Sequence, residues 1–215
     1  MKNFKAIVFD LDGTLTQSDE TIIETTIHTL KEMELYKPFN VHILKGMIGH
    51  HFKEIFDEID IFVPDMEEFI NVFKGNYFGF IDKTKLYPGV FELLNKISES
   101  EIKLGLLTTK GQVQAEKIMH HFSIYDFFDI IVGRVPGVAI KPSPEPLIKI
   151  ANEFNLKTTD LVMVGDTEMD VLCAQNAGAE AWAVTYGYRS SDVLSELKPD
   201  KLITDFSEIN EMVFG

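Results

Sequence analysis

Short apolar runs alternate with helical patterns along most of this sequence, and this alternation limits the fold more than any other feature. The runs are near-continuous in apolar residues, as expected for parallel strands that are covered on both faces. Between them, apolar residues recur at helical spacing, as at positions 90, 93, 94 and 97. The sequence therefore predicts an α/β fold with a doubly wound, Rossmann-like parallel sheet. The predicted strands cover residues 5–9, 102–107, 129–132, 161–164, 181–184 and 201–203.

One long segment interrupts this alternation. Residues 18–87 carry three apolar stripes at helical spacing and no convincing strand. A connection of roughly seventy residues is far longer than the usual loops of about 2–6 residues in such folds. We therefore expect an α-helical cap domain, residues 16–87, inserted into a core domain made of residues 1–15 and 88–215.

Charge and cysteine content limit the partners and the compartment. The formal net charge of −14 disfavours binding to nucleic acid or to an anionic membrane, because both need basic patches. Cys173 is the single cysteine, which excludes an intrachain disulfide and fits a reducing compartment. The sequence shows neither a signal peptide nor an apolar stretch of membrane-spanning length. We expect a cytoplasmic protein, a monomer or a homodimer, that binds neither nucleic acid nor membrane.

Polar and charged residues follow the predicted strands at the point where each strand ends. Because parallel strands place their carboxyl ends at the same edge of a sheet, where ligands bind, we expect these residues to lie together. After the first strand come Asp10, Asp12, Gly13 and Thr14, after the second Thr108, Thr109 and Lys110, after the third Lys141, and after the fourth Asp166 and Asp170.

This set of residues suits phosphoryl transfer. Clustered carboxylates repel one another unless a hard cation lies between them, and Mg²⁺ prefers oxygen ligands. A carboxylate can also attack phosphorus to give an aspartyl-phosphate. A metal ion and a lysine would then offset the charge of the phosphoryl oxygens. Backbone N–H groups at the Gly13 turn could bind the remaining oxygens.

Four segments resemble the motifs of the haloacid dehalogenase superfamily of phosphotransferases, in the order of that family. They are DLDGT at 10–14, LLTT at 106–109, Lys141 before Pro142, and GDTEMD at 165–170. A helical insert between the first two motifs is similar to one subgroup of the family. The resemblance implies Mg²⁺ as the cofactor. It also implies that Asp10 is the nucleophile and a metal ligand, and that Asp12 is the general acid and base, with its backbone carbonyl on the metal. Thr108 would bind the phosphoryl group, and Lys141 would neutralise charge on the nucleophile and the phosphate. Asp166 would bind the metal directly, and Asp170 would support the metal site.

Other residues have weaker support. Gly13, Thr14 and Thr109 are predicted to contact the substrate, and Thr109 is an alternative to Thr108. Asp-Gly is also a common turn signal, so the pair Asp12-Gly13 could be structural. Lys110 is interpreted as a solvated charge. His50 follows Gly49 in the predicted cap and is a candidate for substrate contact.

Asp12 and the fourth motif favour a phosphatase. Asp12 argues against the dehalogenases of the family, which lack this second aspartate. GDTEMD resembles the phosphatases more than the sugar-phosphate mutases. We expect a Mg²⁺-dependent phosphatase that hydrolyses a small phosphorylated metabolite, similar to phosphoglycolate, through an aspartyl-phosphate. The alternatives are an inorganic pyrophosphatase of the same family, a β-phosphoglucomutase-like phosphotransferase and, with least support, a non-catalytic binding protein.

Overall fold

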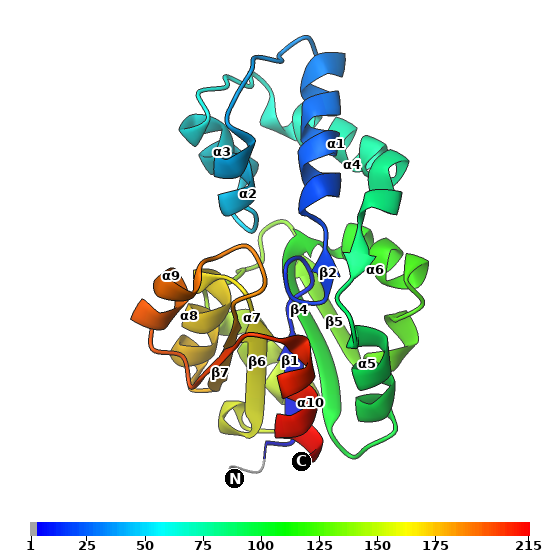
Figure 1. The fold of residues 1–215 in the computed structure, drawn as a ribbon, viewed down its shortest axis with the longest axis vertical. Coiled ribbons are helices and arrows are strands. Elements are labelled where there is room, and N and C mark those ends of the chain that lie inside the picture. Colours follow the sequence, from blue (N-terminus) through cyan, green and yellow to red (C-terminus); the bar gives the residue numbers. More distant parts are fainter. Residues whose placement is uncertain (1–3) are drawn as a thin grey trace. The chain divides into compact units, whose positions relative to one another are not determined.

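The computed structural model describes residues 4–215, which form two compact units (Figure 1). The core unit contains residues 4–15 and Leu86–Gly215, and the insert unit is Thr16–Lys85. Residues 1–3 of the predicted core domain lie outside the described residues.

A six-stranded sheet with the order β5-β4-β1-β6-β7-β8 runs through the core unit. In that order its strands are Ile130–Arg134, Lys103–Gly111, Ala6–Phe9, Leu161–Gly165, Glu180–Val184 and Lys201–Ile203. All of its described strand pairs are parallel, and Phe9 at the end of β1 lies opposite Leu106 of β4 and Val164 of β6. The chain builds the sheet outward on one side of β1 and then on the other, which confirms the predicted doubly wound α/β fold. The carboxyl ends of β1, β4 and β6 therefore meet at one edge.

Strand β4 continues well past the ends of its neighbours. The sequence predicted a strand over residues 102–107, but β4 spans Lys103–Gly111, whereas β1 is only Ala6–Phe9. The register between β4 and β5 shifts between Leu107 and Gly111. The polar residues after Leu107 thus remain in strand conformation, because backbone pairing does not require apolar side chains.

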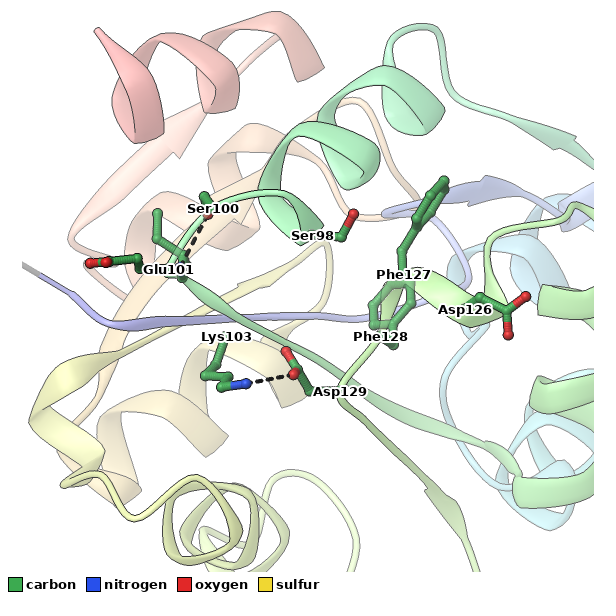
Figure 2. Close-up of a pocket in the computed structure, with 9 residues that line it drawn as sticks. Ser98, Ser100, Glu101, Lys103, Asp126, Phe127, Phe128 and Asp129 are labelled. Atoms are coloured by element: carbon green, nitrogen blue, oxygen red, sulfur yellow. Dashed lines mark hydrogen bonds and ion pairs between the residues drawn. The ribbon is translucent and has the colours of Figure 1, made fainter.

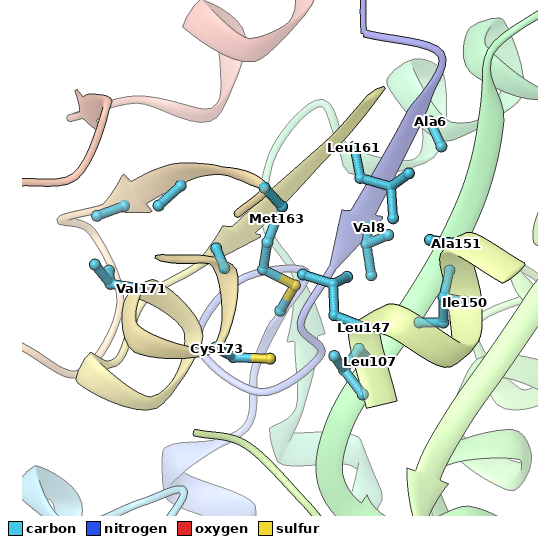
Figure 3. Close-up of a cluster of buried hydrophobic side chains, with 14 of the residues drawn as sticks. Ala6, Val8, Leu107, Leu147, Ile150, Ala151, Leu161, Met163, Val171 and Cys173 are labelled. Atoms are coloured by element: carbon cyan, nitrogen blue, oxygen red, sulfur yellow. The ribbon is translucent and has the colours of Figure 1, made fainter. Parts of the chain in front are cut away.

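Apolar side chains cover both faces of β1. Ala6 and Val8 belong to a buried cluster with residues of α7 and α8, among them Leu147 and Cys173 (Figure 3). The ring of Phe9 points away from this cluster and stacks on Phe206 of α10, with ring centroids 6.3 Å apart. Burial on both faces explains why the run before Asp10 contains no polar residue.

The insert unit is helical, and an aromatic cluster packs α3 against α4. Phe52, Phe56, Phe69 and Phe73 lie with ring centroids between 4.7 and 6.1 Å apart. These rings form a core for this unit, as the apolar stripes of the sequence indicate. The third predicted stripe is divided between α4 and a 3₁₀ helix at Tyr77–Lys83.

A small two-stranded sheet lies where the chain enters and leaves the insert unit. It pairs β2 (Thr16–Gln17) with β3 (Lys85–Leu86). No pattern in the sequence indicates a strand at residues 85–86, because two residues are too few to show a period.

Among residues 4–215, no helix is long and apolar enough to cross a membrane. The bounds of the remaining elements follow. In the insert unit they are α1 (Asp19–Glu32), α2 (Val41–Gly46), α3 (Phe52–Glu58) and α4 (Met66–Asn76). In the core unit they are α5 (Val90–Ser98), α6 (Gln112–His121), β5 (Ile130–Arg134), α7 (Glu145–Glu153), β6 (Leu161–Gly165), α8 (Glu168–Ala177), β7 (Glu180–Val184), α9 (Ser191–Glu196), β8 (Lys201–Ile203) and α10 (Phe206–Phe214), with 3₁₀ turns at Tyr125–Phe127 and Thr158–Asp160.

Candidate active site

Lys141 joins two carboxylates at the edge where β1 and β6 end. Its Nζ donates to Asp10 Oδ1 at 2.8 Å and to Asp170 Oδ1 at 2.5 Å. All three side chains are almost completely buried. The residues come from three distant segments of the sequence, and the fold brings them together as the strand-end rule predicts.

Asp170 is held from both of its oxygens. While Oδ1 accepts from Lys141, Oδ2 accepts from the backbone N–H and the hydroxyl of Thr167, at 3.0 and 2.6 Å. Thr167 and Asp170 form the capping box that begins α8. Asp170 is therefore held in one orientation by Lys141 on one side and Thr167 on the other.

Asp166 is also fixed by two donors. Its Oδ1 accepts from the Thr14 hydroxyl at 3.1 Å, and its Oδ2 accepts from the backbone N–H of Tyr188 at 2.8 Å. The sequence analysis assigned Thr14 to the substrate, whereas the structure shows its side chain on Asp166. A substrate contact of Thr14 stays a prediction.

Glycines allow the backbone to come very close to these carboxylates. A Cβ atom at Gly13 or Gly187 would collide with the side chain of Asp166, and one at Gly165 would collide with that of Asp170. Gly13 also has a positive φ of 87°, which other residues rarely adopt. The glycines of the DLDGT and GDTEMD motifs thus have a steric reason in this structure.

The loop between β7 and α9, residues 185–190, is a part of the site that the sequence analysis missed. It supplies Gly187 and Tyr188 to Asp166, and it is tied to the start of α8 by Arg189. The Arg189 guanidinium donates to both oxygens of Glu168, at 2.7 and 3.1 Å. The run TYGYRS follows a predicted strand at the same sheet edge, so the strand-end rule could have found it.

Asp12 forms an ion pair with Lys110, which the sequence analysis interpreted as a solvated charge. Lys110 Nζ lies 3.1 Å from Asp12 Oδ2, and the two side chains are only 10% and 12% exposed. That interpretation was wrong, because β4 continues past Leu107 and the ammonium group of Lys110 lies beside Asp12.

The other predicted residues lie as follows. Thr108 is buried at the start of the β4 overshoot, and its hydroxyl accepts from the backbone N–H of Lys110 at 3.2 Å. Thr109 is half-buried next to it. His50 belongs to the insert unit, where its Nδ1 lies 3.1 Å from Glu54 Oε2.

Burial sets the protonation of the cluster. It raises the pKa of Asp10 from 3.8 to about 7, although the charge of Lys141 opposes this shift. Burial and the charges of Asp10 and Asp170 raise the pKa of Asp166 well above 3.8. Burial lowers the pKa of Lys141, but the negative charges of Asp10 and Asp170 outweigh it and leave this pKa raised. Lys141 therefore stays protonated, and the raised pKa values show that ionising all the carboxyl groups beside this single ammonium group is unfavourable unless more positive charge is supplied.

A divalent cation would supply such positive charge. Oxygen atoms of Asp10, Asp166 and Asp170 all lie within 4.8 Å of one another. Carboxylate oxygens are the ligands of hard cations such as Mg²⁺ and Ca²⁺, and Mg²⁺ commonly takes one or two carboxylates. The buried acidic cluster is therefore suited to hold a metal ion.

Comparison with known proteins decides the family. The model of the haloacid dehalogenase-like hydrolase family matches residues 7–184. The chain belongs to this family. As a haloacid dehalogenase-like hydrolase, it has the catalytic class that the four motifs indicated, and the predicted resemblance is confirmed.

Relatives of this hydrolase share its whole length. A pyrophosphatase PpaX from Halalkalibacterium halodurans is 32% identical over 211 residues, which cover 96% of this chain and 95% of that protein. A pyrophosphatase PpaX from Bacillus cereus is 30% identical over 94% of this chain and 93% of that protein. The crystal structure of a predicted phosphoglycolate phosphatase from Haemophilus somnus has a TM-score of 0.85 at 26% identity, and it covers 99% of both chains.

A pocket elsewhere on the hydrolase is separate from the candidate active-site residues. It has a volume of about 350 Å³ and lies at the amino end of β4, between Ser98 and Asp129 (Figure 2). An ion pair between Lys103 and Asp129, 2.8 Å long, lines it. None of the predicted site residues contributes to this pocket, because they lie at the opposite end of the strands.

Proposed function

We propose that this hydrolase is a Mg²⁺-dependent phosphatase that cleaves a small phosphorylated metabolite through an aspartyl-phosphate on Asp10. The observation that carries the proposal is the buried network in which Lys141 joins Asp10 and Asp170, with an oxygen of Asp166 within 4.8 Å of oxygens of both carboxylates. A buried charge network of this kind adds little stability by itself, so a catalytic use explains it better.

Asp10 is the proposed nucleophile. The hydrogen bond from Lys141 holds one oxygen of its carboxylate, so that the group keeps a single orientation for in-line attack on phosphorus. The same ammonium group offsets charge on the phosphoryl oxygens. The backbone of the Gly13 turn, with Thr108 and Thr109, is proposed to bind those oxygens.

Asp12 is the proposed general acid and base. It would protonate the leaving oxygen and then remove a proton from the water that hydrolyses the aspartyl-phosphate. Its side chain is fixed beside Lys110 and is less buried than that of Asp10. A carboxyl group in this position can exchange its proton with solvent between the two steps.

Asp10 and Asp166, together with the backbone carbonyl of Asp12, are the proposed ligands of Mg²⁺. When bound, the cation would neutralise the phosphoryl oxygens and polarise the phosphorus. Asp170 would act indirectly by holding Lys141. Residues 185–190 and Thr14 would keep Asp166 in place.

Two substrate types are supported by the relatives. The motifs resemble those of both phosphoglycolate phosphatases and inorganic pyrophosphatases. The name of a structural relative supports phosphoglycolate, and the names of the sequence relatives support inorganic pyrophosphate. We propose that the insert unit, including His50, acts as the cap that selects between such substrates. The mutase alternative has no support beyond the general motifs.

Hydrolysis assays test the proposal. Wild-type protein is expected to release phosphate from phosphoglycolate or pyrophosphate with Mg²⁺ and not with EDTA. Asp10→Asn is expected to abolish release, because an amide is a far weaker nucleophile than a carboxylate. Hydrolysis by Asp10→Asn at the wild-type rate, or no hydrolysis with any divalent metal, would contradict the proposed function.

A further inference from the structure

The ion pair between Lys110 and Asp12 is far more buried than a surface ion pair such as Lys53–Asp57. Its side chains are 10% and 12% exposed, whereas those of the Lys53–Asp57 pair are 75% and 66% exposed. Removing a lysine from water is costly, and an ion pair at this depth gives little net stability in return. Stability alone therefore does not account for the position of Lys110.

The two lysines of the site lie beside different carboxylates. Lys141 contacts Asp10 and Asp170, and Lys110 contacts Asp12. In phosphoryl transfer the attacking and leaving oxygens lie roughly in line on opposite sides of phosphorus. With Asp10 as nucleophile and Asp12 as the acid for the leaving oxygen, Lys141 is the lysine beside the attacking group and Lys110 is the lysine beside the acid.

The backbone supports this placement. Phe9, just before Asp10, is level with Leu106 in the sheet, and Lys110 lies four residues farther along β4. Lys110 therefore follows the strand end at which the nucleophile lies. Its ammonium group is 3.1 Å from Oδ2 of Asp12, the proposed acid for the leaving oxygen.

We propose that Lys110 binds the negative charge of the leaving group and thereby selects substrates that carry a second anionic group, a phosphate or a carboxylate, beyond the scissile bond. This inference rests on the proposed function. As an oxygen of Asp10 bonds to phosphorus, the bond from phosphorus to the leaving oxygen breaks. That oxygen keeps the electron pair and takes the proton of Asp12. The charge that the leaving group already carried is balanced by Lys110.

The overall charge of the protein favours such a cation. A formal net charge of −14 disfavours the approach of an anionic substrate. Lys141 lies between Asp10 and Asp170. Lys110 places a second positive charge next to the group that protonates the leaving oxygen.

Steady-state kinetics with three substrates test the inference. Phosphoglycolate and pyrophosphate have anionic leaving groups, and 2-hydroxyethyl phosphate replaces the carboxylate of phosphoglycolate by a neutral hydroxymethyl group. For Lys110→Met, kcat/KM is expected to fall about 10- to 100-fold with an anionic leaving group and less than about threefold with the neutral one. A loss with pyrophosphate alone identifies phosphate as the bound group, and a loss with phosphoglycolate alone identifies the carboxylate.

Matched variants complete the design. Lys110→Arg keeps the charge and should keep the preference, and Lys110→Gln replaces Lys110→Met if the latter does not fold. Lys103→Met removes the lysine of the Lys103–Asp129 pair at the other end of the same strand and should leave all three rates unchanged.

An equal loss with all three substrates, or no loss with any, would overturn the inference about Lys110. The proposed function would still hold in that case, because wild-type protein would hydrolyse the substrates. If the wild type with Mg²⁺ hydrolysed none of them, the proposed function itself would fail, and the inference with it.

Discussion

The core unit buries charged side chains, whereas the buried polar side chains of the insert unit all carry hydroxyl groups. Asp10, Lys141, Asp166 and Asp170 lie at the edge of the core sheet. In α1 of the insert unit, buried threonines bond mainly to nearby backbone and hydroxyl oxygens. The Thr25 and Thr26 hydroxyls, for example, donate to carbonyl oxygens four residues earlier in the helix.

This difference suits the core unit to chemistry and the insert unit to packing. Buried hydroxyl groups that are bonded within their own unit need nothing more from a ligand. The buried carboxylates of the core remain short of positive charge, so their unit should respond to metal ions and to pH. The buried threonines of the insert unit should not make that unit sensitive to metal ions or to pH.

The largest effect is expected for Asp10→Asn in the core unit. Loss of the nucleophile should lower kcat by about 10³-fold or more with any substrate. Phosphate release in Mg²⁺ is the measurement, and Asp57→Asn on the surface of the insert unit is the control. A similar loss in the control would remove the contrast between the two units.

The stability of the metal-free protein should fall as pH rises. The pKa of Asp10 is raised from 3.8 to about 7, so the folded state binds this proton more tightly than the unfolded state does. The stabilising contribution is present at low pH and is lost as pH rises from about 4 toward 7. In EDTA at pH 8, Asp10→Asn should therefore raise the free energy of unfolding by about 1–3 kcal/mol.

Denaturant unfolding at pH 5 and pH 8 measures this effect. The advantage of Asp10→Asn should shrink at pH 5, where the wild-type carboxyl group is protonated. Added Mg²⁺ should stabilise the wild type more than the variant. A wild type that is the more stable protein at pH 8 in EDTA would show that the carboxylate is not held under repulsion.

A smaller effect is expected from loosening the loop at residues 185–190. Arg189→Met removes the two hydrogen bonds to Glu168, so the backbone of Tyr188 should hold Asp166 less firmly. Metal affinity, measured by calorimetric titration with Mg²⁺, should fall about three- to tenfold. Glu168→Gln combined with Arg189→Met should cost no more than the larger single change, and full additivity would exclude this route.

The smallest effect is expected in the insert unit. The Thr21 hydroxyl donates to the Phe80 carbonyl and bonds to Thr84, whereas Thr26 bonds only within its own helix. Thr21→Val should cost about 1 kcal/mol of unfolding free energy and Thr26→Val less than about 0.5 kcal/mol. Thermal unfolding should give the same differences with and without Mg²⁺. A dependence on metal would mean that the two units do not differ in this way.

The sequence predicted the sheet and the main carboxylates because both follow from local patterns. Continuous apolar runs mark buried parallel strands, and Asp10 and Asp166 each stand directly at the end of one. The strand-end rule applies equally to residues 185–190, which directly follow the predicted strand at 181–184.

Other features depend on contacts between residues far apart in the sequence, which no local pattern indicates. Lys110 looks like a surface residue in the sequence, because nothing there shows that β4 continues past Leu107 and brings it to Asp12. The partner of the Thr14 hydroxyl, Asp166, is 152 positions away. The role of His50 stays a prediction for the same reason, since the motifs lie entirely in the core unit.

The paired strands β2 and β3 have a consequence for modularity. The Tyr87 N–H donates to the Leu15 carbonyl at 3.0 Å. The two segments of the core unit that flank the insert therefore lie side by side. A segment with adjacent ends can be lengthened, shortened or exchanged at little cost in loop-closure entropy and without altering the order of the sheet. Recombination at this junction could therefore give one catalytic domain a series of different inserts while its own sequence stays unchanged.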